Sequence, residues 1–196
     1  MVIKRPKQKD KISILFLGAG KRVSLLKCFK RASKKLNITF KAFAYEKDIY
    51  QPISKEAKII VGKLWDDIHI DRHILKTIEK HKIDIVIANT DPSTICLSRL
   101  KKFHKSCSIS SELSSVQTCF SKLKFQKFCE ENNLPIIPRE EDTFPILVKP
   151  DFGSASKGIK ILNNRFERKI FFDNKDKDYL LQRYIEGIEY TVDMYI

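Results

Sequence analysis

The chain has 196 residues, enough for one ordinary domain together with part of a second. Hydrophobic residues make up 42% of it and recur along its whole length, which excludes a disordered chain. The formal net charge is +14, but acidic residues are interspersed among the lysines. We therefore interpret the excess as a solvated lysine-rich surface, and we disfavour a nucleic-acid partner.

The cysteines and the hydropathy of the sequence indicate the cellular compartment of the protein. The five cysteines include no Cys-x-x-Cys pair and no zinc-finger spacing, so no structural metal site is expected. No apolar stretch is long enough to span a membrane. We expect a cytoplasmic protein with no membrane partner.

The first half of the chain alternates between short apolar runs and segments of helical periodicity. Four apolar runs predict strands, at residues 12–17, 38–44, 57–61 and 83–88. Residues 23–32 and 70–81 carry apolar side chains at helical spacing, and a further helix is expected to begin with Asp91 as its cap and Pro92 in its first turn. Continuous apolar strands suit a sheet covered on both faces, so this half predicts an open parallel α/β sheet of Rossmann-like type.

Residues 117–131 predict another helix, and Leu134–Pro138 then form an extended segment fixed by two prolines, near which we place a domain boundary because the pattern changes after it. Beyond it the sequence predicts strands at residues 145–149, 158–162 and 179–185, with a helix at residues 165–172. From Ile188 to Ile196 apolar and polar residues alternate strictly, which predicts one more strand. Because the chain stops within it, we expect the front portion of a longer protein, whose unfinished sheet would invite self-association.

A glycine-containing turn, Gly18-Ala19-Gly20, lies between the first predicted strand and the following helix. It is compatible with a dinucleotide fold, although the fingerprint's third glycine is replaced by Val23. Glu46, at the end of the second strand, could then hold a ribose hydroxyl. A tight turn explains the glycines equally well. An NAD(P)-binding oxidoreductase domain therefore stands as an alternative.

Residues 151–158 form a stronger candidate for a phosphate site. They join two predicted strands and are mostly small, so their backbone N–H groups could converge on phosphate oxygens. Ser154 and Ser156 add hydroxyl donors, and Lys157 adds charge. Lys149 ends the preceding apolar strand, where an ammonium is costly unless it meets a counter-charge or reaches water. A flexible hairpin loop is the alternative, but it would not require this lysine.

The ordered set of these residues resembles the ATP-grasp proteins, and most closely their carbamoyl-phosphate-synthase-like group. The resemblance runs through Lys122, Pro135, Pro138, Leu147–Pro150, Gly153–Gly158 and Leu181–Asp193. It implies that residues 1–115 form a Rossmann-like pre-ATP-grasp domain. Residues 116–196 would form the first, incomplete part of an α+β ATP-grasp domain, including its nucleotide-binding lobe.

The resemblance implies roles in holding the ATP phosphates. Lys122 is similar to the family's lysine that reaches the phosphates from the connecting lobe, and Lys149 to the strand lysine that contacts the α- and β-phosphates. Six loop residues are similar to the lid over the phosphates: Gly153, Ser154, Ala155, Ser156, Lys157 and Gly158.

The resemblance also implies where the base and the sugar would lie. Gln182, Arg183 and Ile185 match the segment that lines adenine, partly through backbone groups, and Glu189 matches the acid that binds the ribose hydroxyls. One position departs from the pattern, because Ser121 stands where the family usually has an acid.

The implied function is that of an ATP-dependent carboxylate–amine ligase or carbamoyl-phosphate-synthase-like enzyme acting through an acyl phosphate. ATP would be the cofactor, and a carboxylate or carbonate-type molecule the substrate. The family holds Mg²⁺ with acids of a later lobe, so Mg²⁺ is expected only for the complete enzyme and no turnover for this chain alone. No catalytic residue is assigned, and Asp193 is not taken as a metal ligand. A basic nucleic-acid-binding module and a degenerate ATP-grasp scaffold remain alternatives.

Overall fold

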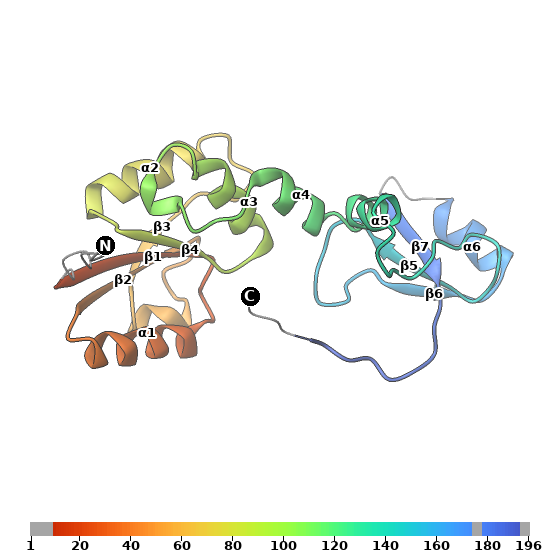
Figure 1. Ribbon diagram of the computed structural model, residues 1–196, viewed down its shortest axis with the longest axis horizontal. Coiled ribbons are helices and arrows are strands. Elements are labelled where there is room, and N and C mark those ends of the chain that lie inside the picture. Colours follow the sequence, from red (N-terminus) through yellow and green to blue (C-terminus); the bar gives the residue numbers. More distant parts are fainter. Residues whose placement is uncertain (1–9, 174–177, 193–196) are drawn as a thin grey trace, which may run out of the picture. The chain divides into compact units, whose positions relative to one another are not determined.

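Strands and helices alternate along residues 10–173 and 178–192, the parts of the chain that the computed structural model describes. The chain divides into two units, Met1–Val116 and Gln117–Ile196, and helix α4 (Leu113–Phe120) contains the point of division. Each unit has its own sheet and hydrophobic core (Figure 1). The predicted α/β class, with an open parallel sheet in the first part, is confirmed.

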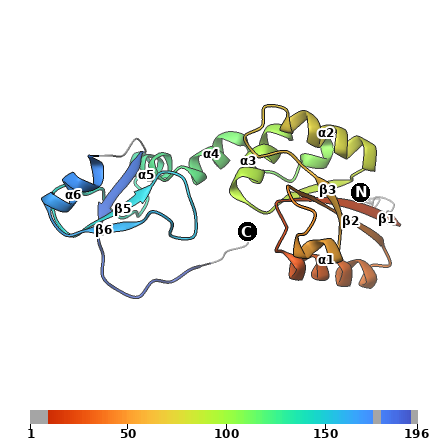
Figure 2. The ribbon, with the colours of Figure 1, turned by 180° about the vertical axis from the view of Figure 1, so that it is seen from behind.

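The first unit is built on a parallel sheet with strand order β3-β2-β1-β4. Its strands are β1 (Lys11–Leu17), β2 (Thr39–Glu46), β3 (Lys58–Val61) and β4 (Ile85–Ala88). Its helices are α1 (Val23–Lys35), α2 (Ile70–His81) and α3 (Asp91–Leu100), with short 3₁₀ turns η1 (Pro52–Lys55) and η2 (Lys105–Cys107). Figures 1 and 2 show α1 on one face of this sheet and α2 with α3 on the other.

Two hydrophobic clusters explain why the apolar strands are continuous. Successive side chains of a strand point to opposite faces. In β1, Leu15 and Leu17 pack into the cluster shared with α2 and α3, whereas Ile14 and Phe16 pack into the cluster shared with Leu26 of α1. Because both faces of the central strand are covered, its consecutive positions from Ile14 to Leu17 are all apolar.

Helix α3 begins with Thr90 as its N-cap, not with Asp91 as the sequence suggested. The backbone of Thr90 is extended, and its N–H donates to the hydroxyl of Ser93 at 3.0 Å. Asp91 lies one residue inside the helix, where its charge favours the positive end of the helix dipole.

The second unit contains an antiparallel sheet with strand order β6-β5-β7. Its strands are β5 (Ile146–Pro150), β6 (Lys160–Leu162) and β7 (Tyr179–Arg183), and its helices are α5 (Lys122–Glu131) and α6 (Arg165–Phe172). Phe171 of α6 packs against Ile146 and Val148, so one face of β5 carries this unit's core.

The single helix predicted over residues 117–131 is wrong, because the chain breaks it into α4 and α5 at Ser121. Ser121 has an extended backbone, with φ −93° and ψ 116°, and its hydroxyl accepts the N–H of Lys124 at 3.1 Å. An apolar periodicity cannot reveal such a break, since the helical spacing continues across it.

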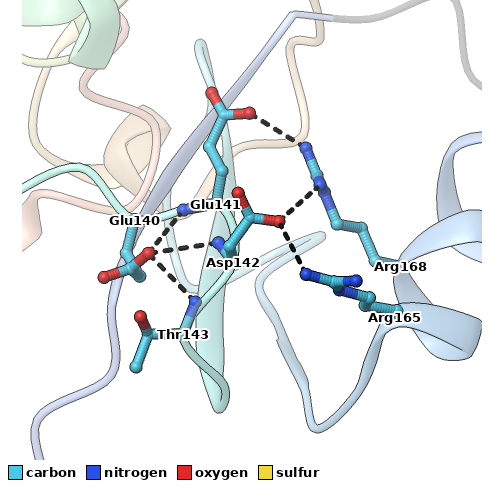
Figure 3. A network of polar contacts seen from close by, with 6 residues as sticks. All are labelled: Glu140, Glu141, Asp142, Thr143, Arg165 and Arg168. Atoms are coloured by element: carbon cyan, nitrogen blue, oxygen red, sulfur yellow. Dashed lines mark hydrogen bonds and ion pairs between the residues drawn. The ribbon is translucent and has the colours of Figure 1, made fainter.

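A polar network connects the loop before β5 to α6 (Figure 3). One oxygen of Glu140 accepts the backbone N–H groups of Glu141, Asp142 and Thr143 at 3.0, 3.1 and 3.0 Å. Arg168 of α6 then pairs with Glu141 at 2.9 Å and with Asp142 at 3.8 Å. Each exposed pair contributes less than about 1 kcal/mol, so the network orients the loop more than it stabilises the unit.

The strand predicted from Ile188 onward is wrong for residues 188–192, which follow β7 without ladder pairing. The side chains of Ile188 and Tyr190 are 81% and 79% exposed. Alternation makes a strand only where a partner strand accepts its backbone hydrogen bonds, and no strand of the described residues does so here. Residues 193–196 of this prediction lie outside the described residues.

Candidate functional site

Lys149 lies on the face of the second sheet that points away from α6. Its neighbour Val148 packs against Phe171, so the alternation of side chains turns Lys149 to the opposite face. The register places Lys149 opposite Leu180, which is only 4% exposed. The ammonium therefore stands at the rim of a hydrophobic surface.

Partial burial is the main cause that lowers the pKa of Lys149 below its ordinary value. The carboxylate of Glu189 opposes this shift, and the positive charge of Lys122 adds to it. Three of the residues predicted from the sequence therefore lie close enough to interact electrostatically. Together they form a cluster with two ammonium groups and one carboxylate.

Asp151, which follows β5 directly, docks the start of α5 onto the end of that strand. Its side chain is buried, with 8% of its surface exposed. The carboxylate accepts the hydroxyl of Ser121 at 2.8 Å and the N–H of Leu123 at 2.9 Å. These bonds satisfy two donors at the start of the helix, where intrahelical partners are missing.

This docking also places Lys122. Its ammonium donates to the carbonyl oxygens of Asp151 at 3.1 Å and Gly153 at 3.2 Å, so it lies over the first residues of the loop. The sequence analysis did not single out Asp151 for this role. The sequence feature that could have indicated it is an aspartate that directly follows the Lys-Pro end of a strand. A second feature is a serine at the start of α5 that could cap this helix. Asp151 thus brings a carboxylate to the helix start that Ser121 caps.

The loop after β5 bends sharply and packs little. The backbone φ angle is positive at Gly153, Ala155, Ser156 and Gly158, with 56° and 57° at the two non-glycine residues. A β-carbon at Gly158 would lie 2.9 Å from Cγ of Pro150, so the loop returns close to the end of its own strand. All residues from 152 to 160 are exposed, including Ser154 and Lys157. The loop's polar groups therefore face solvent rather than the core.

Gln182 shares the sheet face of Lys149, because it pairs with Leu147 in the antiparallel register. It is 4% exposed, and its side-chain nitrogen donates to Oε1 of Gln126 at 2.8 Å and to the carbonyl of Ile137 at 3.3 Å. Its own Oε1 is buried and has no hydrogen-bond partner. An unpaired buried acceptor costs about 1–3 kcal/mol, so this oxygen marks a place where a donor would be favourable.

Arg183 and Ile185 lie differently from Gln182. Arg183 pairs with Ile146 and so belongs to the α6 face, while its backbone N–H donates to the carbonyl of Pro138 at 3.1 Å. Ile185 is 60% exposed and follows the end of β7. The structure therefore gathers Lys122, Lys149, Glu189 and Gln182 on the helix α5 side, and it does not bring the Arg183 side chain to that group.

The glycine-containing turn of the first unit is built differently. Gly18 has a φ of 66°, and a β-carbon there would lie 2.8 Å from Oγ1 of Thr90. Ala19 is fully buried. Burial raises the pKa of Glu46 above its ordinary value, and the backbone N–H groups of Ala19 and Gly20 oppose this shift. Oε1 of the same carboxylate is buried and has no hydrogen-bond partner among the described residues. The chain's own carboxylate thus lies beside the N–H groups that a phosphate would need.

Within the described residues, no group of three or more His, Cys, Asp or Glu side chains is placed to hold a metal ion. No helix in the same part of the chain is long and apolar enough to cross a membrane.

Comparison with protein families finds a match for the second unit. Residues 119–196 match the model of the ATP-grasp domain. No curated protein sequence matches the chain. The match begins just before Lys122 and includes β5, its loop and β7.

Solved structures share the fold at low sequence identity. An L-amino acid ligase from Bacillus licheniformis has a TM-score of 0.67 at 13% identity, over 93% of this chain and 46% of that one. An N5-carboxyaminoimidazole synthetase from Staphylococcus aureus has a TM-score of 0.66 at 16% identity, over 91% and 48%. The biotin carboxylase domain of a 2-oxoglutarate carboxylase from Hydrogenobacter thermophilus, in complex with MgADP, ADP and bicarbonate, has a TM-score of 0.64 at 17% identity, over 89% and 44%. The chain thus spans about half the length of these proteins.

Proposed function

We propose that this chain, which belongs to the ATP-grasp superfamily through residues 119–196, binds ATP on the Lys149 face of its second sheet. In the complete enzyme this site would serve an ATP-dependent ligase that joins a carboxylate or carbonate-type substrate to an amine. The observation that carries the proposal is Lys149 itself, a half-buried ammonium with a lowered pKa beside a second ammonium. A phosphate chain would supply the negative charge that this arrangement lacks.

The polar groups around Lys149 fit the parts of ATP. Lys149 and Lys122 would bind the inner phosphates, with the loop Gly153–Gly158 closing over them. The unpaired Oε1 of Gln182 would accept a donor such as the exocyclic amine of adenine. Glu189, which interacts with Lys149, would accept the ribose hydroxyls. Base, sugar and phosphates would then lie along one side of the sheet.

The chemistry follows from the ligase class. A substrate carboxylate oxygen attacks the γ-phosphorus, the bond from phosphorus to the β-phosphate oxygen breaks, and ADP leaves. The amine then attacks the acyl carbon of the resulting acyl phosphate, loses a proton, and releases inorganic phosphate. Lys122 and Lys149 would hold the phosphate chain in line and reduce the repulsion met by the attacking anion. The carbamoyl-phosphate-synthase-like version uses bicarbonate as the first nucleophile and ammonia as the second.

Mg²⁺ would neutralise further phosphate charge when bound. The described residues contain no cluster of three acidic, histidine or cysteine side chains for it, and the roles proposed above need only Lys122, Lys149, Gln182 and Glu189. The biotin carboxylase domain named above was solved with MgADP, which supports an ATP site and a requirement for Mg²⁺ in the complete enzyme.

Calorimetric titration of the chain with a non-hydrolysable ATP analogue tests the site. Replacing Lys149 with Met keeps the aliphatic stem and removes the charge, and we expect the affinity to fall by about tenfold or more. Lys127→Met, on the exposed side of α5, is the matched control and should change the affinity less than about twofold. NADH and a short oligonucleotide are titrated in parallel. Unchanged ATP affinity in Lys149→Met, or tighter binding of NADH, would contradict the proposal.

Two further properties belong to the proposal. All five cysteines are free and Cys28 and Cys119 are exposed, which fits a reducing compartment such as the cytoplasm. Ile185 and Ile188 expose apolar surface, which favours self-association of this chain. Light scattering after gel filtration would reveal a monomer if that second property is wrong.

A further inference from the structure

A surface pocket of about 730 Å³ lies at the amino end of the first sheet, away from the strand ends that carry Gly18 and Glu46. Its volume is that of a typical small-molecule site, about 300–1,000 Å³. Cationic side chains dominate its lining, and we call it the lysine pocket: Lys11, Lys41, Lys58, Lys80 and Lys82, with His81.

The topology gathers these lysines from separate elements. Lys11 begins β1, and Lys58 begins β3, which joins the sheet further along, level with Phe43 of β2; both line the pocket. Lys41 pairs with Ser13 in the register, and Lys58 pairs with Phe43, so all three lysines stand on the sheet face that carries α2. Helix α2 runs back along that face and ends at the same edge, which adds the last two lysines and His81.

Opposite charge is scarce in the lysine pocket. Among the described residues, Asp84 is the one carboxylate that lines it, and its Oδ2 accepts the N–H of Ser13 at 2.9 Å. The ion pairs between described residues of this unit join other lysines and arginines to carboxylates that do not line the pocket. Elsewhere in the same unit lysines do find partners, as Lys30 does with Glu56 at 2.6 Å.

The neighbouring Lys11 lowers the pKa of Lys41 below its ordinary value, and desolvation and then Lys58 lower it further. The carbonyl end of α2 favours cations near Lys80 and Lys82, but a helix dipole acts only within its last turn. It does not explain why three strand lysines are directed to the same place. Repulsion among them would be relieved by a bound anion carrying several charges.

The shape and lining of the pocket distinguish between anions. A single-stranded nucleic acid would need exposed aromatic rings on which its bases stack. Phe43, one of the two aromatic rings in the lining, is 8% exposed and packed in the core, and the other, that of His81, lies with its centroid 4.9 Å from that of Phe43. Several ammonium groups around one compact space suit a small anion with closely spaced charges.

We propose that the lysine pocket binds a condensed phosphate, such as an inorganic triphosphate or the triphosphate group of a nucleotide. The site is separate in sequence and in structural unit from the ATP site around Lys149, and it does not depend on that site. Lys41, Lys58 and Lys11 would contact the phosphates from the strands, and Lys80 and Lys82 from the end of α2. A small phosphate metabolite bound there would stabilise the first unit.

The test is calorimetric titration of the full chain with sodium triphosphate, with sodium sulfate at matched ionic strength as the comparison. Replacing Lys41 and Lys58 together with Gln should weaken triphosphate binding by about tenfold or more, since two of the converging charges are removed. Lys27→Gln combined with Lys55→Gln removes the same charge outside the pocket and should change the affinity less than about twofold. The Lys149→Met variant should keep this binding, which separates the pocket from the ATP site.

Thermal unfolding gives an independent readout, because the unfolding temperature of each variant is compared with and without triphosphate. Triphosphate should raise the unfolding temperature of the wild type and of the control, but not that of the Lys41/Lys58 variant. ATP that binds through the same lysines more tightly than triphosphate would identify a nucleotide as the source of the phosphate group. Binding of triphosphate no tighter than sulfate, or binding unaffected by the Lys41/Lys58 change, would overturn the proposal. Lysine-dependent binding of a single-stranded oligonucleotide without binding of triphosphate would do the same.

Discussion

The two turns that follow a central strand, at Gly18–Gly20 and at residues 151–158, look alike in sequence but are used in opposite ways. In the first unit the turn is packed, since Ala19 is fully buried and the carboxylate of Glu46 lies near the N–H groups of the turn. In the second unit the loop is exposed, and the ammonium groups of Lys122 and Lys149 outnumber the carboxylate of Glu189 that interacts with Lys149. Small residues after a strand therefore indicate that other atoms come close to the backbone of the turn. The charge of the neighbouring side chains decides whether those atoms belong to the protein's own fold or to a ligand.

Among the substitutions that test this difference between the two turns, Asp151→Ala should cause the largest loss of unfolding free energy. The substitution leaves the hydroxyl of Ser121 and the N–H of Leu123 without their buried acceptor, so we expect the second unit to lose about 2–4 kcal/mol of unfolding free energy. Hydrogen exchange of the amides in α5 and β5 measures this loss. Asp173→Ala, at an exposed position after α6, is the control and should have little effect. A loss below about 1 kcal/mol would show that Asp151 does not dock the helix.

Gly18→Ala tests whether the first turn is a packing device. The left-handed backbone and the 2.8 Å approach to Oγ1 of Thr90 should cost about 2 kcal/mol of unfolding free energy in the first unit. The fluorescence of Trp65, the one tryptophan of the chain, reports this unit during urea unfolding. Gly187→Ala, where a β-carbon meets no atom within 4 Å, serves as the control. If both variants unfold at the same urea concentration as the wild type, the turn is not tightly packed.

A smaller effect should appear in the pH dependence of the first turn. Burial holds the pKa of Glu46 above its ordinary value, so the folded chain binds a proton there more readily than the unfolded chain does. The stability contributed by this group is therefore fully present at low pH and is lost as pH rises through the raised pKa. Urea unfolding of the wild type and of Glu46→Gln, between about pH 4 and pH 7, should show the wild type gaining relative to the variant as pH falls. The reverse trend would mean that the two N–H donors outweigh burial.

The smallest effect is expected for Ala155→Gly in the exposed loop. Relief of a left-handed backbone, with φ 56°, is worth about 1 kcal/mol, and the greater freedom of glycine in the unfolded chain costs about the same. The unfolding free energy should therefore stay near that of the wild type, in contrast to the change at Gly18. Equilibrium unfolding followed by circular dichroism measures it, and a loss of more than about 1 kcal/mol would indicate that the loop is packed after all.

Most of the helices and strands could be predicted because their apolar periodicity matches what their surroundings require. Helix α2 (Ile70–His81) has the bounds that its pattern predicts, and so does α6 (Arg165–Phe172). Ser121 shows the limit of this reasoning. The side chains on either side of it continue a helical pattern, and the break is stabilised by Asp151, which lies 30 residues later in the chain.

In the candidate site, too, some features follow from a short segment of sequence and others depend on residues far apart in the chain. Lys149 could be recognised from its position at the end of an apolar strand, since the cost of burying an ammonium is a property of that segment alone. The unpaired Oε1 of Gln182 could not be foreseen, because it depends on Gln126 and Ile137 occupying the other end of the side chain. The failed strand at residues 188–192 has the same origin, since alternation describes one strand while pairing requires two.

By itself, the sequence determined that this protein is an α/β chain with a parallel sheet in its first part and a lysine beside a small-residue loop in its second. Those properties follow from burial and backbone preference, which act over a few neighbouring residues. Only the tertiary structure decided that Glu46 lies near the first turn, that Asp151 places Lys122, and that five lysines line one pocket of the first unit. Each depends on contacts between residues far apart in the chain, and such contacts are set by strand order, register and helix direction.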